Sequence, residues 1–505
     1  MRKRLIVSAA SALSLLLAVP ASASGPGPQP GAEGVGDPYY PNFGNGGYRV
    51  SHYDIRLKYQ PATDELEGTT TVLATATQDL SRFNLDFTLK VSEVRVNGRL
   101  ATFATSGEQE LEITPARPLL KGSPITVVVR YKDVPSTVQR YGGYSAWRRT
   151  PDGAVVANEP LAAAWWFPSN DHPSNKATFD VSVLVPNGTQ VVSNGVLTGT
   201  SSQIGWTRYN WREDKPQATY LSMLGIGKFD ITQDTTASGI PVYNAYSKDL
   251  GANAGAARAS VERTGELVDF LSGYFGAYPF SSIGGFVPNI PSSGGLESQT
   301  RIIYGPGQFD RGANTSVVVH ELAHQWYGDS VSLARWKDIW LNEGFAFYAQ
   351  YLWSEHENEG TAQELADYAY ARYPAGDPFW SVEPGDPGAD EPLSWPVYLR
   401  GAMAIQALRV KLGDETFFRI LKGWPTEHRY GNATVEDFEA YAEKLSGQKL
   451  GDFFTTWLFT PSKPPVGPSG AKPAALTAQG NGAVPAEPKS WKKIQETAAV
   501  HANRR

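Results

Sequence analysis

The chain has 505 residues, 41% of them hydrophobic and 19% charged, which is enough for two or three globular domains with large cores. Its 45 basic and 51 acidic residues give a formal charge of −6, and this mild acidity argues against a nucleic-acid partner, which would favour a basic surface. The chain contains no cysteine, and this excludes disulfides, a cysteine nucleophile and cysteine zinc ligands.

The N-terminus has the pattern of a secretory signal peptide over residues 1–23. Basic residues at positions 2–4 precede an apolar stretch at residues 5–19, and small residues at positions 20–23 resemble a cleavage site. We expect a secreted protein with no stable membrane insertion after the signal is removed; the alternative is an uncleaved anchor. Residues 24–46 are rich in Gly and Pro, which is typical of a flexible leader.

The next segment, residues 47–232, has the patterns of β-structure. Tyr53, Ile55 and Leu57 alternate with polar residues, which is typical of a half-buried strand. Further along, Asn97-Gly98 is a strong signal for a tight hairpin turn. These patterns predict an N-terminal β-rich domain.

Helical spacing replaces this alternation in the second half of the chain. It extends over residues 256–275, 315–329 and 338–356, so residues 233–460 are expected to form a mostly helical domain. Residues 461–505 contain many Pro, Ala and Gly and few apolar anchors, which is typical of a disordered tail. The expected fold class is therefore α+β, with a β-rich domain followed by a helical one.

A metal-binding pattern lies inside one of the expected helices. His320 and His324 in the sequence HELAH are four residues apart, so their imidazoles share one helix face and can converge on one ion. Zinc needs a third protein ligand, and Glu343, separated from His324 by 18 residues and early in the next helix, is the candidate. A chance match on a surface helix and a pair of core histidines are the alternatives.

The residue between the two histidines suits general base chemistry. Zinc makes its bound water much more acidic, with a pKa near ~7 in such sites. Glu321 would lie near that water, could accept its proton and could later pass the proton to the leaving amine. Asp338 could orient a ligand histidine, or it could simply be a carboxylate at a helix N-terminus.

These residues resemble the aminopeptidase N family of gluzincin zinc metallopeptidases, which also includes leukotriene hydrolase-like enzymes. The similar segments are residues 320–329 (HELAHQWYGD) and 336–346 (WKDIWLNEGFA), with the spacing HExxH-x18-E, and residues 168–179 upstream. The resemblance covers most of residues 47–460. It implies a thermolysin-like catalytic domain with one Zn²⁺ per chain, in a short form without the long helical C-terminal domain that many members have.

The resemblance also assigns roles to three residues outside the metal pattern. Glu297 lies in Gly-Gly-Leu-Glu-Ser, where the family has Gly-Ala-Met-Glu-Asn, and matches the glutamate that binds the free amino end of the substrate. Tyr398 matches a tyrosine that would donate a hydrogen bond to the developing oxyanion, in a pattern where Arg400 replaces the family's Lys. Glu159 matches a Gln or Glu that contacts the same amine. Ser298 stands where the family has Asn.

The combined expectation is a secreted zinc aminopeptidase that acts on peptides with a free N-terminus. Glu321 and Tyr398 would be catalytic, and Glu297 with Glu159 would anchor the substrate amine. A zinc endopeptidase with an open cleft is the nearer alternative, and an epoxide hydrolase is a distant one. An inert secreted binding module that keeps a zinc site is the alternative from another class. The oligomeric state and the preferred N-terminal side chain stay open.

Overall fold

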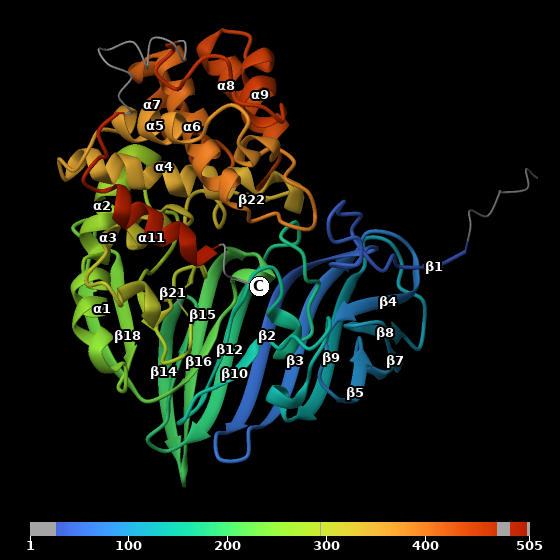
Figure 1. Ribbon diagram of the computed structural model, residues 1–505. Helices are drawn as coiled ribbons and strands as arrows, with labels where there is room; N and C mark the ends of the chain where they lie inside the picture. The colour runs from blue at the N-terminus through green and yellow to red at the C-terminus, as the bar shows by residue number, and fades with distance from the viewer. Residues whose placement is uncertain (1–26, 293, 472–484, 502–505) are drawn as a thin grey trace, which may run out of the picture.

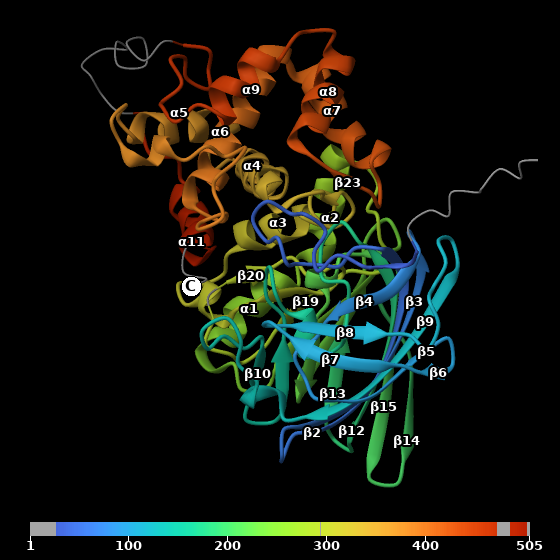
Figure 2. The same ribbon diagram turned by 90° about the vertical axis from the view of Figure 1, so that its right-hand side faces the viewer.

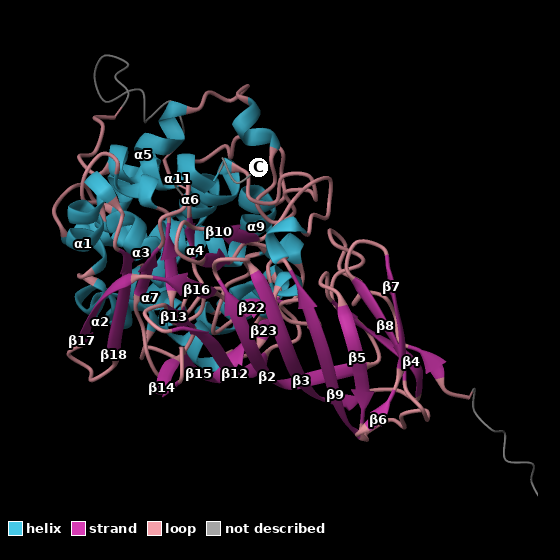
Figure 3. Ribbon diagram, turned by 90° about the horizontal axis from the view of Figure 1, so that it is seen from below, coloured by secondary structure: helices cyan, strands magenta, loops and turns pink. Residues whose placement is uncertain are grey.

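The computed structural model describes residues 27–292, 294–471 and 485–501. Strands make up most of the first half and helices most of the second, which confirms the expected α+β class. Most helices lie toward the top and left of Figure 1 and most strands toward the bottom and right, and Figure 3 gives the two kinds of element different colours. The expected signal peptide, residues 1–23, lies outside the described residues.

The N-terminal domain is built on an eight-stranded sheet whose strands are, in order across it, β14 (Val196–Gln203), β15 (Trp206–Gln217), β12 (Ala177–Pro186), β2 (Tyr48–Gln60), β3 (Glu65–Ala76), β9 (Pro124–Asp133), β5 (Val91–Val96) and β6 (Arg99–Leu100). Tyr53, Ile55 and Leu57 of β2 all point into the core, as their alternation predicts. The hairpin expected at Asn97-Gly98 joins β5 to β6, and both of its turn residues have positive φ.

Two four-stranded sheets complete this domain. One has the order β1 (Gln29–Pro30), β4 (Leu80–Asp86), β8 (Glu110–Thr114), β7 (Thr102–Ser106); the other has the order β10 (Trp147–Arg149), β11 (Ala154–Val156), β16 (Leu224–Gly227), β13 (Gln190–Ser193). Their apolar side chains join those of the large sheet in one buried cluster, which gives the domain a core of its own.

The C-terminal part of the chain, which the resemblance implies to be catalytic and which is called the catalytic part below, begins with a five-stranded sheet. Its order is β17 (Phe229–Thr235), β18 (Pro241–Ser247), β19 (Gly285–Val287), β21 (Ile302–Tyr304), β20 (Gly295–Leu296). Because β17 pairs with β18 as an antiparallel hairpin, residues 229–232 lie in this sheet and not in the N-terminal domain, where the sequence placed them. A short parallel pair, β22 (Ser332–Leu333) and β23 (Asn432–Ala433), lies further along the chain.

The helices of the catalytic part share one large apolar core. They are α1 (Ala254–Val261), α2 (Thr264–Phe275), α3 (Thr315–Ala323), α4 (Trp340–His356), α5 (Ala362–Arg372), α6 (Trp395–Leu412), α7 (Asp414–Glu427), α8 (Val435–Ser446), α9 (Gly451–Leu458) and α11 (Trp491–His501). In Figure 2, α3 lies between the upper helices α5–α9 and the strands. Within the described residues, no helix combines the length and apolar character needed to cross a membrane.

Two of the expected helices have different limits in the structure. The helical pattern at 256–275 is divided into α1 and α2, because Glu262 and Arg263 form a turn between them. The pattern at 315–329 forms a helix only as far as Ala323. Beyond it the chain turns back, with Gly328 at φ +135° and a backbone hydrogen bond from Asp329 N to His324 O.

The leader differs from the expected flexible segment over its described part, residues 27–46. Asp37 is buried and accepts hydrogen bonds from the backbone N–H of Trp336 and from the ring of His172. Phe43 is buried in the core of the N-terminal domain. The leader is therefore anchored to both domains by side chains whose burial its Gly- and Pro-rich composition does not reveal.

The tail also differs from the disorder expected for residues 461–505, because its described parts are packed. Trp491 and Ile494 of α11 are fully buried in the catalytic core. The backbone carbonyl of Lys493 accepts a hydrogen bond from Asn314, whose side chain caps the N-terminus of α3. Helix α11 thus covers one end of the helix that carries the two metal-pattern histidines.

A buried carboxyl group in the N-terminal domain predicts how stability depends on pH. Asp171 accepts a hydrogen bond from the Thr219 hydroxyl, but burial raises its pKa from 3.8 to about 7. The folded state therefore binds this proton more tightly than the unfolded state, so its stabilising effect is complete below pH 4 and is lost as the pH rises to 7. Relative to Asp171→Asn, the wild type should lose about 3–4 kcal/mol of unfolding free energy over this range.

Urea unfolding of both proteins at pH 4.5 and pH 8 measures this difference. Asn keeps an oxygen that can accept from Thr219, so the exchange removes the titration with little change in shape. Parallel pH profiles for the two proteins would contradict the prediction.

Candidate metal centre and substrate site

The metal pattern lies on α3 and at the start of α4. Asn314 caps α3 by accepting a hydrogen bond from Ser316 N–H, and Val317, Val318 and Val319 fix the helix in the core. His320 and His324 therefore project from one buried face, one turn apart. The first turn of α4 brings Glu343 against them.

The ligand atoms are arranged as a single zinc ion requires. His320 Nε2 is 3.3 Å from His324 Nε2, and Glu343 Oε2 is 3.2 Å and 3.5 Å from these two nitrogens. Tetrahedral zinc with bonds of about 2.0–2.1 Å holds its ligand atoms roughly 3.3–3.4 Å apart, so one ion fits between them. Three protein ligands leave a fourth position for water or substrate. Within the described residues, this is the one group of three such side chains close enough to share an ion.

Neighbouring groups orient both imidazoles. His320 Nδ1 lies 3.2 Å from Gln350 Oε1, and His324 Nδ1 lies 3.2 Å from the carbonyl oxygen of Tyr327. A proton on each Nδ1 can be donated to these acceptors, which leaves both Nε2 lone pairs directed at the metal position. Gln350, whose amide also donates to the Ser316 hydroxyl, was not predicted from the sequence. No local signal identifies it, because it lies 30 residues from His320.

Glu343 carries a negative charge at the site. Burial alone would raise the pKa of this carboxyl, but the adjacent His324 and His320 rings lower it well below 4.5. Glu343 therefore stays ionised and ready to hold a cation.

Glu321 is fully buried beside the metal ligands. Its carboxylate lies directly against Gly295 of β20, and a Cβ at that glycine would overlap the carboxylate carbon and its Oε1. Position 295 is Ala in the family's motif, so in this chain the glycine lets the strand and the carboxylate approach each other closely. The five-stranded sheet thereby forms one wall around Glu321.

Tyr398 of α6 lies on another side of the metal ligands. Its ring is nearly parallel to the ring of His320, with centroids 6.0 Å apart, and it is buried. The sequence-predicted tyrosine is therefore close to the place where a substrate carbonyl would meet the metal.

Arg400, which replaces the family's Lys two positions after Tyr398, has a separate task. Its buried guanidinium donates hydrogen bonds to five backbone carbonyls, those of Trp380, Val382, Thr456, Trp457 and Thr460. This set fills the guanidinium's donor capacity and ties the end of α9 to α6. Arg400 is thus a structural residue of the catalytic part.

Asp338 does not orient a ligand histidine. Its carboxylate accepts two hydrogen bonds from Arg335 and one from the backbone N–H of Val435. It fastens the start of α8 to the segment before α4, so of the two interpretations the structural one holds.

Glu297 and Glu159 are both buried, and the negative charge of Glu297 acts on the ring of His324. The Tyr220 hydroxyl donates to Glu297 Oε1 at 3.3 Å. Burial and the nearby negative charges of Glu297 and Glu159 raise the pKa of Tyr220. The N-terminal domain supplies Glu159 and Tyr220, and the catalytic part supplies Glu297. Tyr220, one of 24 tyrosines, was not predicted from the sequence because it lies far from any motif.

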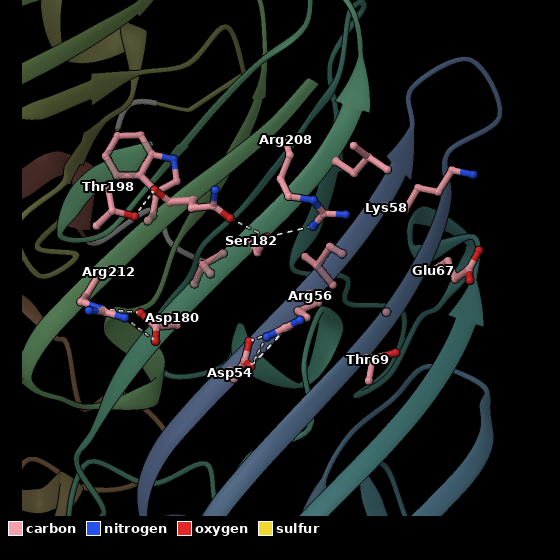
Figure 4. A pocket seen from close by; sticks show the side chains of 16 residues that line it. Asp54, Arg56, Lys58, Glu67, Thr69, Asp180, Ser182, Thr198, Arg208 and Arg212 are labelled. Atoms are coloured by element: carbon pink, nitrogen blue, oxygen red, sulfur yellow. Dashed lines mark hydrogen bonds and ion pairs between the residues drawn. The ribbon is translucent and has the colours of Figure 1, made fainter. Parts of the chain in front are cut away.

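A separate hollow of about 610 Å³ lies over the open face of the large sheet, away from these residues (Figure 4). Four of its charged side chains form ion pairs: Arg212 pairs with Asp180, and Arg56 pairs with Asp54. This pattern is typical of a solvated sheet face.

The fold and the site define a metallopeptidase catalytic domain preceded by a β-rich domain. Residues 307–457 match the Peptidase family M1 domain, and residues 49–221 match the Peptidase M1 N-terminal domain. The chain belongs to this family, the aminopeptidase N family of zinc metallopeptidases, and zinc is the metal of its His-His-Glu site.

Relatives and solved structures agree with this membership. The chain is 29% identical to Aminopeptidase M1 of Arabidopsis thaliana over 60% of its length and 25% identical to Glutamyl aminopeptidase of Rattus norvegicus over 83%. It spans only 36% and 48% of these two proteins. An M1 zinc metallopeptidase from Deinococcus radiodurans, one of whose structures holds a Tyr-Ser-Ala substrate, is similar with a TM-score of 0.74 and 27% identity, covering 84% of this chain and 97% of that one.

Proposed function

We propose that the chain is a zinc-dependent aminopeptidase that hydrolyses the first peptide bond of peptides with a free amino end. The observation that carries the proposal is Glu297, a buried carboxylate held by Tyr220 beside the metal ligands. Buried carboxylates need a cationic or hydrogen-bonding partner, and a substrate α-ammonium group would supply one. The tripeptide in the similar Deinococcus structure supports short peptides as the substrate class.

In this mechanism, Glu297 and Glu159 bind the α-ammonium group and so place the first peptide bond beside His320, His324 and Glu343. When held by His320, His324 and Glu343, zinc would supply Lewis acidity for the scissile carbonyl and would make a bound water more acidic. Glu321 accepts a proton from the attacking water on its carboxylate and returns that proton to the nitrogen of the leaving amine.

Tyr398 should contribute to the rate of the chemical step more than to binding. Its phenol would donate a hydrogen bond to the carbonyl oxygen as that oxygen gains negative charge, so its effect arises in the transition state. We expect Tyr398→Phe to lower kcat by about 10²–10³-fold with little change in KM. Steady-state kinetics on an aminoacyl substrate, with zinc content measured in parallel, check this. A raised KM at unchanged kcat would show that the hydroxyl acts in binding alone.

The aminopeptidase assignment is tested with an aminoacyl chromogenic substrate and its N-acetyl form. The wild type should turn over the free amine at least about 10²-fold faster, and Glu297→Ala should lose most of that preference. The exposed Glu415→Ala is the matched control. Equal turnover of the two substrates would reject amine anchoring. Cleavage of N-blocked peptides at internal bonds would favour the endopeptidase, and stoichiometric zinc without any hydrolysis would favour the inert binding module.

We also propose that the protein is exported, on the pattern of basic, apolar and small residues over positions 1–23. Expression in a secreting host, followed by N-terminal sequencing of the protein in the medium, tests this. A mature chain that begins close to Ser24 is expected. Retention of the intact N-terminus in the membrane fraction would favour the uncleaved anchor.

A further inference from the structure

The loop that carries Glu297 is held from the N-terminal domain. Asn194 donates a hydrogen bond from Nδ2 to the carbonyl oxygen of Gln299 at 2.6 Å. The Thr300 hydroxyl oxygen accepts from Gly195 N–H at 2.6 Å, and Glu213 Oε2 accepts from this hydroxyl at 3.1 Å. These contacts fix the far end of the loop to the strands, but they do not set its distance from the metal ligands.

A second set of contacts comes from the metal side, where Gln325 makes two hydrogen bonds to the loop. Gln325 directly follows His324 and is fully buried. Its Nε2 donates to the carbonyl oxygen of Glu297 at 3.0 Å, and its Oε1 accepts from the backbone N–H of Thr300 at 2.9 Å. The side chain of Gln325 therefore binds the backbone of the loop at two residues, Glu297 and Thr300.

The remaining hydrogen-bonding positions of this amide are also used. Nε2 donates to Asp329 Oδ2 at 2.8 Å, and Oε1 accepts from the Tyr278 hydroxyl at 3.2 Å. Two N–H donors and two lone pairs are the whole capacity of a glutamine side chain. A buried amide whose donors and acceptors are all hydrogen-bonded has one orientation. Gln325 therefore has little freedom to rotate or to release the loop.

We propose that Gln325 is a positioning residue that sets the distance between the amine anchor Glu297 and the metal ligands. Gln325 directly follows the metal ligand His324 in the chain. Any shift of the loop relative to the metal must therefore break the hydrogen bonds of Gln325. A fixed anchor-to-metal distance makes the first peptide bond, and no later one, the bond that is cleaved. This inference rests on the proposed aminopeptidase function.

The test compares Gln325→Met, which keeps the length of the side chain without its hydrogen bonds, with Gln406→Met. Gln406 is a buried glutamine of α6 that bonds Tyr348 and Gln363, away from the substrate site. For free-amine substrates, Gln325→Met should raise KM about tenfold and lower kcat about tenfold. Its rate on the N-acetyl form, its zinc content and the kinetics of Gln406→Met should stay within about twofold of wild type.

A double-mutant cycle separates positioning from general stability. If Gln325 acts through Glu297, adding Gln325→Met to Glu297→Ala should lower kcat/KM for the free-amine substrate by less than about a further twofold. If the losses of the two single variants multiply in the double variant, or if the N-acetyl substrate is affected equally, the inference is overturned while the aminopeptidase proposal stands. A wild type that does not prefer the free amine would overturn both.

Hydrogen exchange supplies a readout that needs no activity. The Thr300 amide donates to Gln325 Oε1, so in metal-free Gln325→Met its exchange should be at least about tenfold faster than in metal-free wild type. Gln325→Asn keeps the amide but is too short to reach both backbone points, and it should show the same loss if the methionine variant fails to fold. Unchanged protection at Thr300 in the folded variant would overturn the inference.

Discussion

Replacing Glu321 with Gln should lower kcat by about 10³–10⁴-fold while the protein keeps one zinc ion per chain. The carboxylate is fully buried between α3 and β20, next to His320 and His324 but outside the group of ligand atoms. Gln has almost the same shape and cannot accept the proton of the attacking water. The loss should therefore arise in the chemical step, with KM changed by no more than a few-fold.

Zinc analysis by mass spectrometry and steady-state kinetics on an aminoacyl substrate measure the two parts of this prediction. Glu415→Gln, on the exposed start of α7, is the matched control and should behave as wild type. If the activity of Glu321→Gln is within tenfold of wild type, Glu321 is not the general base. Loss of zinc would instead mean that the carboxylate contributes to metal binding.

The metal group could be predicted from the sequence because its geometry is local. His320 and His324 are related by one helical turn, and apolar residues around them indicate a buried helix before any tertiary contact is known. Glu343 follows from the need for a third ligand and from the family's spacing. The structure brings these three side chains together and places Glu321, Tyr398 and Glu297 near them, whereas Glu159 is near Tyr220.

The support of this site could not be predicted in the same way. Gln350 orients His320 from another helix, Tyr220 reaches Glu297 from the other domain, and Gln325 holds a loop that lies 25 residues earlier in the chain. Each is an ordinary polar residue at its position in the sequence. Only the packing of sheet against helix gives it a partner, and packing is a property of the whole fold.

The two terminal segments differ from expectation for a related physical reason. Composition reports the average character of a segment, whereas a few side chains decide whether the segment is anchored. Asp37 and Phe43 anchor the leader, and Trp491 and Ile494 anchor the tail. Burial of one Trp or Ile side chain contributes about 1.5–3 kcal/mol or more, enough to hold a short helix against a preformed core.

Replacing Glu343 with Ala should abolish stoichiometric zinc binding and, with it, all hydrolysis. The carboxylate lies 3.2 Å and 3.5 Å from the two imidazole nitrogens and supplies the only negative charge among the three ligands. Two imidazoles hold zinc far more weakly than a three-ligand site. The affinity should fall by well over 10²-fold, because even loss of a group that only orients a ligand costs 10–100-fold. Ala also leaves a space where water can enter and compete for the histidines.

The same change should make the melting temperature of the protein independent of zinc. Zinc at 100 times its Kd stabilises the folded wild type by about 2.7 kcal/mol, so a chelator should lower its melting temperature. In Glu343→Ala the melting temperature should be the same with and without chelator. The control is Glu357→Ala, an exposed glutamate at the end of the same helix, which should keep both the zinc and the chelator effect. If Glu343→Ala still binds one equivalent of zinc after dialysis, the ligand set is wrong. The roles of Glu321, Tyr398 and Glu297, all argued from that metal position, would then have to be rebuilt.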